Sequence, residues 1–374
     1  FWAVDGDVRF IKENLCLLED SVALGRLFDI DVIQTDGMKI SRTDLGFSTR
    51  KCLICNQEAF VCSRARTHSV KELLEQECQI MTNYFAKQHA RKLSSLSMQA
   101  LLYEVSVTPK PGLVDRNNTG AHQDMDIFTF EASAVSLNHY FEQFALCGIE
   151  NGHEPFSRIF SRLRSLGIQA EETMFRATNQ VNTHKGLIFS LAIMNGSLGY
   201  MYANHIPYSP DALLKINRKL VADVLEDFND VTVENARTNG ERLYALYGMK
   251  GARGEALSGY HTVLKKALPV LKHQLDRGLS LNDAGAVTLL YIMAHSEDTN
   301  IVNRSSYHSM KKIQSILHET LNDPEFINKD PIPYIESLDR EFIKNNISPG
   351  GSADLLALTF FLYLFENSGL SSIL

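Results

Sequence analysis

Residues 212–228 read ALLKINRKLVADVLEDF, and apolar side chains recur along this stretch at steps of three and four residues. That spacing places them on one face of a helix. Similar stripes run through 260–271 and 313–321, and almost no segment after residue 95 alternates with period two. We therefore predict a mainly α protein, with a large all-α domain over residues 92–374. The apolar positions of the first stretch are Leu213, Ile216, Leu220, Val221, Val224 and Phe228.

Residues 1–85 have a different pattern, in which short apolar runs alternate with turn residues. Asp36 and Gly37 lie between the runs DIDVI and MKIS, and an Asp-Gly pair in this position favours a tight hairpin turn. Residues 68–102 then become helical in period. The sequence thus predicts a small α+β domain over 1–85, with a boundary near residues 80–95.

The composition restricts the class of protein. The chain has 374 residues, 44% of them apolar and 22% charged, as expected for packed globular domains. A net charge of -7 argues against binding to duplex nucleic acid. The apolar run 355–365 is shorter than the ~20 residues of a membrane span, so we expect a buried core helix and no membrane partner. No signal peptide is recognisable, and six cysteines in this length suggest a reducing cytoplasm.

The most informative segment for function is EVSVTPKPGLVDRNNTGAHQDMDIFTFEAS, residues 104–133. Its prolines and glycines predict a shaped loop, because proline fixes φ and glycine permits positive φ. Lys110 and Arg116 are suited to phosphates, and the carboxylates of Asp124 and Asp126 are suited to Mg²⁺. The alternative is a solvated turn in which Asp124 or Asp126 caps the next helix.

Two further segments carry residues suited to anions. In NQVNTHKGLIFS, residues 179–190, a polar cluster precedes an apolar helix that Thr183 could cap, and His184 is either functional or structural. In NARTNGERLYALYGMKGARGEALSG, residues 235–259, glycines alternate with basic residues, although the P-loop spacing is missing. The candidate residues of these segments are Asn182, His184, Lys185, Arg253 and Glu255.

Acidic residues occur in two later segments, HSEDTNIVNR at 295–304 and ISPGGSADLLA at 347–357. Asp298 and Asp354 each stand at the edge of an apolar helix, where Asp354 could also be an N-cap. We expect Asp124, Asp126, Asp298 and Asp354 to converge on a metal–triphosphate site in the helical core.

The first domain has two possible metal sites. Cys52, Cys55, Cys62 and His68 have the composition of a zinc site, but their spacing matches no common zinc finger, and buried cysteines acting as small hydrophobes are the alternative. Asp29 and Asp31 have alternate-residue spacing, which would put both on one face of a strand as a divalent-metal pair.

The segments 108–134, 181–194, 251–259, 298–304 and 348–357 occur in this order, and together they resemble triphosphoribosyl-dephospho-CoA synthase of the citrate lyase system. The resemblance covers roughly residues 97–370. It implies that ATP and 3′-dephospho-CoA are the substrates and that adenine is released, giving the precursor of the citrate lyase prosthetic group.

The segments GRLFDIDVI and ISRTDLGFSTRKCLICNQEAFVCSRARTHSVKEL are similar to the C-terminal part of apo-citrate lyase phosphoribosyl-dephospho-CoA transferase. That enzyme attaches the precursor to the acyl carrier protein of citrate lyase. The chain therefore resembles a fusion of two steps, with a truncated first domain. A non-catalytic adaptor that docks the carrier protein is the alternative for this domain.

The resemblance implies attack on the ribose C1 of ATP by the 2′-hydroxyl of dephospho-CoA, through an oxocarbenium-like transition state. A metal-dependent hydrolase of ribosyl or phosphate bonds is the rival interpretation. We expect Asp29, Asp31 and Arg26 at the pyrophosphate in the first domain. In the second domain we expect Mg²⁺ on the four aspartates, catalysis by His184, Glu255 and Asp126, and substrate binding by Lys110, Arg116, Asn182, Lys185, Arg253, Asn300 and Arg304.

Overall fold

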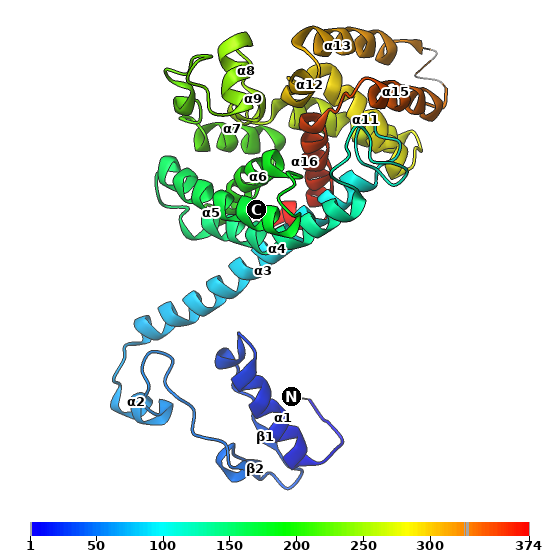
Figure 1. Ribbon diagram of the computed structural model, residues 1–374. Coiled ribbons are helices and arrows are strands. Elements are labelled where there is room, and N and C mark those ends of the chain that lie inside the picture. Colours follow the sequence, from blue (N-terminus) through cyan, green and yellow to red (C-terminus); the bar gives the residue numbers. More distant parts are fainter. Residues whose placement is uncertain (1, 325, 327–328, 374) are drawn as a thin grey trace. The chain divides into compact units, whose positions relative to one another are not determined.

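The structure is a computed structural model that describes residues 2–324, 326 and 329–373. The chain divides into two compact units, Phe1–Gln88 (unit 1) and His89–Leu374 (unit 2). Helices dominate both units (Figure 1), which confirms the prediction of a mainly α protein. The long helix α3, Val70–Ser106, contributes to both units.

Unit 1 holds α1 (Val8–Ser21), the hairpin β1 (Val32–Ile33) and β2 (Lys39–Ile40), α2 (Ala59–Ala65), the first part of α3, and the short helices η1 (Gly25–Leu27) and η2 (Thr43–Leu45). The predicted hairpin is confirmed, since β1 and β2 pair antiparallel and Gly37 has a φ of 86° in the turn. Each strand has only two residues, so Asp29 and Asp31 precede β1. Their predicted place on one strand face is wrong.

Unit 2 continues with helices that enclose one apolar core. The stripe at 212–228 does not form a single helix, because α7 ends at Leu220 and a turn leads into the short helix η3. Val221, Val224 and Phe228 are nevertheless buried, so the apolar pattern predicted burial better than helix length. The other elements are α4 (Ile127–Glu150), α5 (Phe156–Ala177), α6 (Lys185–Ala203), α7 (Pro210–Leu220), η3 (Glu226–Phe228), α8 (Asn239–Tyr247), α9 (Gly251–Leu257), η4 (Val263–Ala267), α10 (Leu268–Asp276), α11 (Leu281–His295), α12 (Thr299–Arg304), α13 (Tyr307–Leu321), α15 (Ile332–Lys344), α16 (Gly350–Asn367) and η5 (Leu370–Ser372).

Helices α6 and α16 are apolar on nearly every side and form the centre of unit 2. By length and composition alone α6 could cross a membrane, but 72% of it is buried inside the protein, as in a core helix. The prediction that 355–365 is a buried core helix is confirmed by α16. Helix α6 packs unusually close to α4, since a Cβ on Gly148 would lie 2.0 Å from the Gly196 carbonyl oxygen. This packing fixes where α6 begins.

The segment between α3 and α4 is a shaped loop, as predicted. Two buried carboxylates hold it. Asp115 accepts hydrogen bonds from the backbone N–H groups of Asn117 and Asn118, at 2.7 and 3.0 Å. Asp339, on α15, accepts from the Gly112 N–H at 2.8 Å and from the Asn118 side chain at 3.0 Å. Gly112 has a φ of 68°, and a Cβ there would lie 2.1 Å from the Ile347 carbonyl oxygen, so only glycine fits.

Candidate active site

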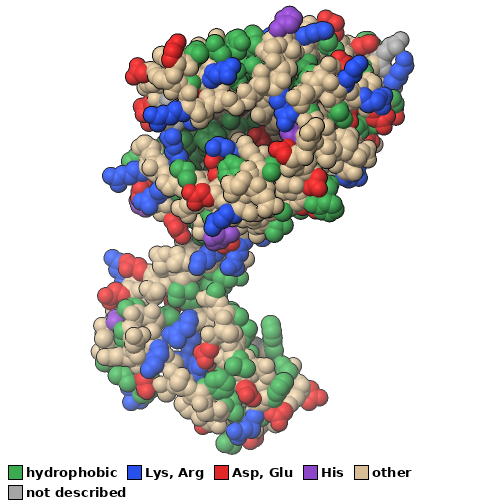
Figure 2. All heavy atoms as spheres, in the orientation of Figure 1, with side chains coloured by type: hydrophobic (Ala, Val, Ile, Leu, Met, Phe, Trp, Pro, Cys, Tyr) green, Lys and Arg blue, Asp and Glu red, His purple; other side chains and the backbone are tan. Residues whose placement is uncertain are grey.

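Helices α6, α9, α12 and α16 all begin at one cavity of about 420 Å³ in unit 2. The first N–H groups of a helix lack partners within the helix, and its start carries a partial positive charge. Helices α6 and α16 are long, so their starts make the cavity suitable for an anion. Figure 2 shows a hollow on this unit, with acidic atoms in its depth and basic side chains around it.

Most of the residues that the sequence singled out in unit 2 line this cavity, although they come from distant segments. It is bordered by Lys110, His122, Asp124, Asn182, His184, Lys185, Glu255, Asn300, Arg304 and Asp354. The loop at 107–126 and the starts of α6 and α16 meet here, and of the four aspartates expected to converge, Asp124 and Asp354 border the cavity. Arg116, Asp126, Arg253 and Asp298 do not border it.

Two acidic residues and a lysine form a buried charged group at the cavity wall. The Lys110 Nζ lies 2.5 Å from a carboxylate oxygen of Glu104, and both side chains are almost inaccessible. Burial raises the pKa of Glu104, and the Lys110 ammonium opposes that rise. Burial also raises the pKa of Asp354 well above its usual range, and nearby Glu104 and Asp298 raise it further. The site therefore carries more buried acid than one lysine neutralises.

The Asp354 carboxylate lies against the start of α6. A Cβ placed on Gly186 would be 2.3 Å from Asp354 Oδ2, so a larger residue there would displace the carboxylate. No hydrogen bond from a described residue stabilises this carboxylate. The capping alternative for Asp354 is wrong, because α16 begins at Gly350 and Pro349 holds the N-cap position. Asp354 is half-buried, and its carboxylate borders the cavity without a hydrogen-bond partner among the described residues, so it is available to a ligand.

Glu255, on α9, is a second acid at the wall. One oxygen accepts a hydrogen bond from the Thr262 hydroxyl at 2.8 Å, while the other is buried without a partner among the described residues. Burial raises the pKa of Glu255, and the hydrogen bonds from Thr262 oppose the rise. A carboxylate with a raised pKa is a stronger base than an ordinary one.

His184 is buried at the start of α6. Thr183 donates to the Ser133 hydroxyl at 2.8 Å, and Ser133 lies 2.7 Å from His184 Nδ1. Burial, together with the charge of nearby Lys110, lowers the pKa of His184 to about 3, so the ring is neutral at pH 7. If Ser133 donates to Nδ1, the proton sits on Nε2, which has no partner among the described residues. Thr183 does not cap α6, which corrects that prediction.

His122 and Arg304 close another side of the cavity. His122 lies 2.8 Å from the Ser348 hydroxyl through Nε2 and 3.0 Å from an Arg304 nitrogen through Nδ1. Arg304 also donates to the Ala121 carbonyl at 2.9 Å. Burial lowers the pKa of His122, Arg304 lowers it further, and Asp124 opposes this. Asp124 itself is mostly exposed at the rim.

Three predicted site residues have structural partners instead. Asp126 caps α4 through Thr129, which was the alternative interpretation. Asp298 caps α12 with one oxygen and accepts from the Ser352 N–H and hydroxyl, at 2.7 and 2.8 Å, with the other. Arg116 donates to Asn282 at 2.9 Å outside the cavity. In the described part of the chain, the four aspartates do not gather as a ready set of metal ligands.

A second cavity of about 430 Å³ adjoins the first and shares the starts of α6 and α9 with it. Its wall combines apolar side chains with basic ones, including Lys250 and Arg253. The Arg253 guanidinium lies 4.7 Å from the centre of the Phe228 ring, a cation–π distance. Arg253 therefore belongs to this cavity. The two cavities share Lys185, Gly186, Gly251, Ala252 and Thr299.

The acidic pair of unit 1 is divided between two ion pairs. Asp29 lies 2.9 Å from Arg50, and Asp31 lies 2.6 Å from Lys39. Arg26 donates to the Lys51 carbonyl at 2.5 Å. Neither aspartate belongs to a metal-ligand group of the described residues. The roles predicted for these residues at a pyrophosphate stay predictions.

Family models match both units. Residues 90–372 match the family described as ATP:dephospho-CoA triphosphoribosyl transferase. The chain belongs to this family. Residues 1–84 match a second family, apo-citrate lyase phosphoribosyl-dephospho-CoA transferase. The resemblance seen in the sequence is thus confirmed, and the chain is a fusion of the two transferase families.

Curated relatives of this transferase share the fusion or only its larger part. "Protein CitXG" of Haemophilus influenzae is 36% identical over 97% of this chain and 78% of that protein. "Protein CitXG" of Leuconostoc mesenteroides is also 36% identical, over 97% of this chain and 79% of its own length. The 2-(5''-triphosphoribosyl)-3'-dephosphocoenzyme-A synthase of Haemophilus ducreyi is 37% identical over 82% of this chain and 98% of its own. No solved structure matches.

Sequence reasoning missed Glu104 and Gly186, which border this transferase's cavity, and Ser133, which bonds to His184 at its wall. Glu104 lies near the end of α3, where an acidic residue looks like a solvated position. Gly186 follows Lys185 without any turn signal, and Ser133 lies inside α4. A signal existed only for Glu104, which is six residues before Lys110 in an otherwise apolar stretch. Gly186 and Ser133 can be identified only from their packing in the structure.

Proposed function

We propose that unit 2 transfers the 5-triphosphoribosyl group of ATP to the 2′-hydroxyl of 3′-dephospho-CoA and releases adenine. The observation that carries this proposal is the cavity at which α6 and α16 begin, inside the segment that matches the transferase family. Its volume of about 420 Å³ lies within the range of small-molecule sites. The cavity combines anion-binding helix starts with buried acids, as a metal–triphosphate complex requires.

The triphosphate occupies the cavity where helix starts and basic side chains meet. Lys185 and Arg304 border it from different sides, and the first N–H groups of α6 and α16 add uncharged donors. Asn182 and Asn300, also at the wall, supply amide groups for the ribose or phosphates. With Ser133 donating to Nδ1, the buried Nε2 of His184 carries the ring proton and has no partner among the described residues. These groups hold the substrate so that C1 of its ribose is oriented for attack.

The residues present fit a magnesium ion. Asp354 is half-buried at the wall without a hydrogen-bond partner among the described residues, and Glu104 lies close enough to raise its pKa. Mg²⁺ is commonly held by one or two carboxylates together with substrate phosphates and water. Asp354 and Glu104 are therefore the proposed ligands, with Asp124 at the rim. The ion would neutralise the negative charge of the triphosphate. Asp298 can join them only by giving up its bonds to Ser352.

The acceptor occupies the second cavity, whose apolar and basic wall suits a molecule with a pantetheine arm and a diphosphate. The two cavities share the starts of α6 and α9, and Glu255, on α9, borders the first. We assign Glu255 as the general base. It takes the proton of the 2′-hydroxyl while the hydroxyl oxygen bonds to C1. The C1–N bond breaks, and adenine leaves with that electron pair and takes up a proton from water, while Glu255 returns its proton to water, so that the step balances.

For unit 1, the family match supports an interaction with the acyl carrier protein of citrate lyase. Arg26, Asp29 and Asp31 lie within the matched residues and stay candidates for contacts to the pyrophosphate. The free thiols of the chain suit a reducing compartment, and the cytoplasm is the proposed location.

The proposal is tested by incubating the full chain with ATP, Mg²⁺ and 3′-dephospho-CoA, then measuring adenine and the mass of the product. We expect one adenine per product, and a product heavier than dephospho-CoA by one triphosphoribosyl group. An acceptor analogue without the 2′-hydroxyl is the control and should give no product. Adenine release that does not need dephospho-CoA would support the rival hydrolase and contradict the proposal.

A further inference from the structure

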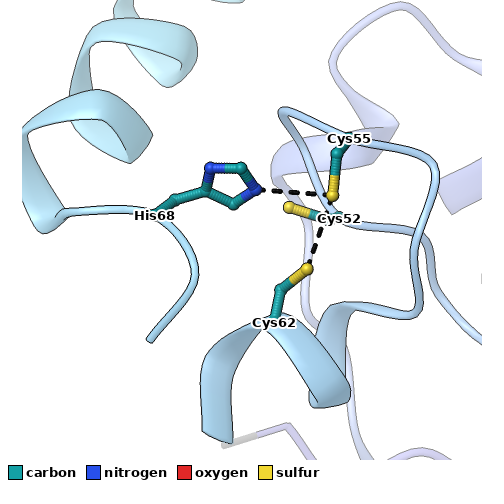
Figure 3. A group of neighbouring side chains, drawn as sticks. All are labelled: Cys52, Cys55, Cys62 and His68. Carbon is teal, nitrogen blue, oxygen red and sulfur yellow. Dashed lines mark hydrogen bonds between the residues drawn. The ribbon is translucent and has the colours of Figure 1, made fainter. Parts of the chain in front are cut away.

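The cysteines of unit 1 form a group that the proposed function does not use. Cys52, Cys55, Cys62 and His68 point toward one another (Figure 3), and their potential ligand atoms all lie within 4.8 Å of one another. The sulfurs of Cys55 and Cys62 are 3.4 Å apart, and His68 Nε2 lies 3.4 Å from the Cys55 sulfur. All the cysteines of this group are free thiols.

These distances fit a tetrahedral ion. Zinc lies ~2.3 Å from sulfur and ~2.0–2.1 Å from a histidine nitrogen, so ligand atoms of a tetrahedral site with three sulfurs and one nitrogen are roughly 3.5–3.8 Å apart. The closest pairs in this group are already at 3.4 Å, and the others lie within 4.8 Å. Small rotations of the side chains would complete the geometry. Three sulfurs and one imidazole are the ligand set that favours zinc over magnesium or calcium.

The backbone brings the four side chains together and supplies an N–H contact to one of the sulfurs. A bridge pairs Lys51 with Glu58, so the chain between them forms a short knob that carries Cys52 and Cys55. The Ile54 N–H lies 3.5 Å from the Cys52 sulfur, the kind of bond that supports a metal-bound thiolate. Cys62 lies on α2, and His68 lies in the connection from α2 to α3. The ligands thus join segments that no regular secondary structure connects.

Unit 1 also lacks an ordinary hydrophobic core. Between residues 2 and 85, the hydrophobic side chains that are buried are those of Cys16, Cys52 and Cys62. Large apolar residues such as Phe10, Phe60 and Leu74 are exposed in this unit. A domain of this size rarely folds on a small core alone and commonly needs a metal or a disulfide. The alternative of cysteines as plain core residues explains neither the half-buried Cys55 nor the histidine.

We propose that Cys52, Cys55, Cys62 and His68 bind a structural zinc ion that holds the segment 51–68 together. Four protein ligands leave no open position, so the ion stabilises the fold of unit 1 and takes no part in group transfer. The ion would connect the start of α3 to the knob at 52–57. The site is independent of the cavity in unit 2, and its test does not depend on transferase activity.

The test measures the metal content of the full chain, purified without chelator under reducing conditions, by elemental analysis and native mass spectrometry. We expect one zinc ion per chain, and its loss in Cys55→Ser. Cys78→Ser is the matched control, because Cys78 is exposed and outside the group, and it should retain the ion. Replacement of zinc by Co²⁺ should give the intense thiolate-to-metal absorption of a tetrahedral site.

His68→Cys guards against a variant that merely fails to fold. It keeps four ligands, so it should retain zinc, and its cobalt spectrum should shift toward that of a four-sulfur site. The proposal is overturned if folded wild-type chain holds no stoichiometric zinc when zinc is supplied. It is equally overturned if Cys55→Ser retains zinc as firmly as Cys78→Ser.

Discussion

At the scale of single residues, the cavity depends on acids that are costly to bury. Asp354 and Glu255 were expected from their sequence segments, but their environments were not. Sequence patterns show residue types and spacing, whereas a pKa depends on burial and on neighbours that come from other segments. The same limit explains why Glu104 and Gly186 were missed and why Asp298 was expected to be a free ligand. Its second hydrogen-bond partner, Ser352, is on another helix.

Asp354→Asn should stabilise the protein at pH 7 in the absence of ligands. The folded-state pKa of Asp354 is raised by burial, so its contribution is most favourable below about pH 4 and is lost as the pH rises toward the folded pKa. A neutral amide avoids that loss. Urea unfolding should show a gain of about 1–3 kcal/mol. Asp276→Asn, at an exposed site, is the control, and an equal or lower stability of Asp354→Asn would contradict this account.

Glu255 should determine the pH dependence of the transfer. As general base it must be deprotonated, so kcat/KM should increase as the pH rises through a pKa above the ordinary glutamate value. Glu255→Gln should lower the rate by about 10²–10⁴-fold and remove this acidic limb. A slower variant that keeps the limb unchanged would mean that Glu255 only positions other groups.

At the scale of elements, helix starts and one loop create the site. The proline and glycine pattern correctly predicted a shaped loop before α4, because φ preferences are local. Helix ends were less predictable. The apolar residues singled out in 212–228 are buried, but the helix that they predicted ends at Leu220. Thr183 bonds to Ser133 instead of capping α6. The prediction of a hairpin in unit 1 was correct, but its two-residue strands do not include Asp29 or Asp31.

The hydrogen bond from Asn118 to Asp339, which holds the loop before α4, can be tested by exchanging the two residues. Asp339→Asn places an amide donor against the Asn118 amide, so it should lower the free energy of unfolding by about 1–3 kcal/mol and reduce activity. The double variant Asn118→Asp with Asp339→Asn restores one donor and one acceptor in reversed order. It should recover most of the stability and activity, as measured by urea unfolding and adenine release. A double variant as impaired as the sum of its single changes would argue against this hydrogen bond.

At the scale of the whole molecule, two units match two transferase families. The large unit gathers charged residues from five separated segments around one cavity, which lies within the residues that match the triphosphoribosyl transferase family. Sequence motifs predicted the convergence of four aspartates, of which Asp124 and Asp354 border this cavity. They could not predict which acid lies deepest, since this depends on how α6 and α16 pack.

Binding of MgATP should therefore stabilise unit 2 and leave unit 1 unchanged. MgATP at about 100 times its Kd should stabilise the binding unit by about 2.7 kcal/mol. Hydrogen exchange resolved by peptide should show slower exchange in the loop at 107–126 and at the starts of α6 and α16, while residues 8–65 remain unchanged. Protection confined to residues 8–65 would place the nucleotide in the wrong unit.

The most direct test is the rate of adenine release from ATP by the full chain with Mg²⁺ and 3′-dephospho-CoA, compared between wild type and Asp354→Asn. We expect the wild type to release adenine only with the acceptor present, and the folded variant to be slower by about 10²–10³-fold. A folded Asp354→Asn variant that releases adenine at the wild-type rate would show that the reaction does not take place in this cavity.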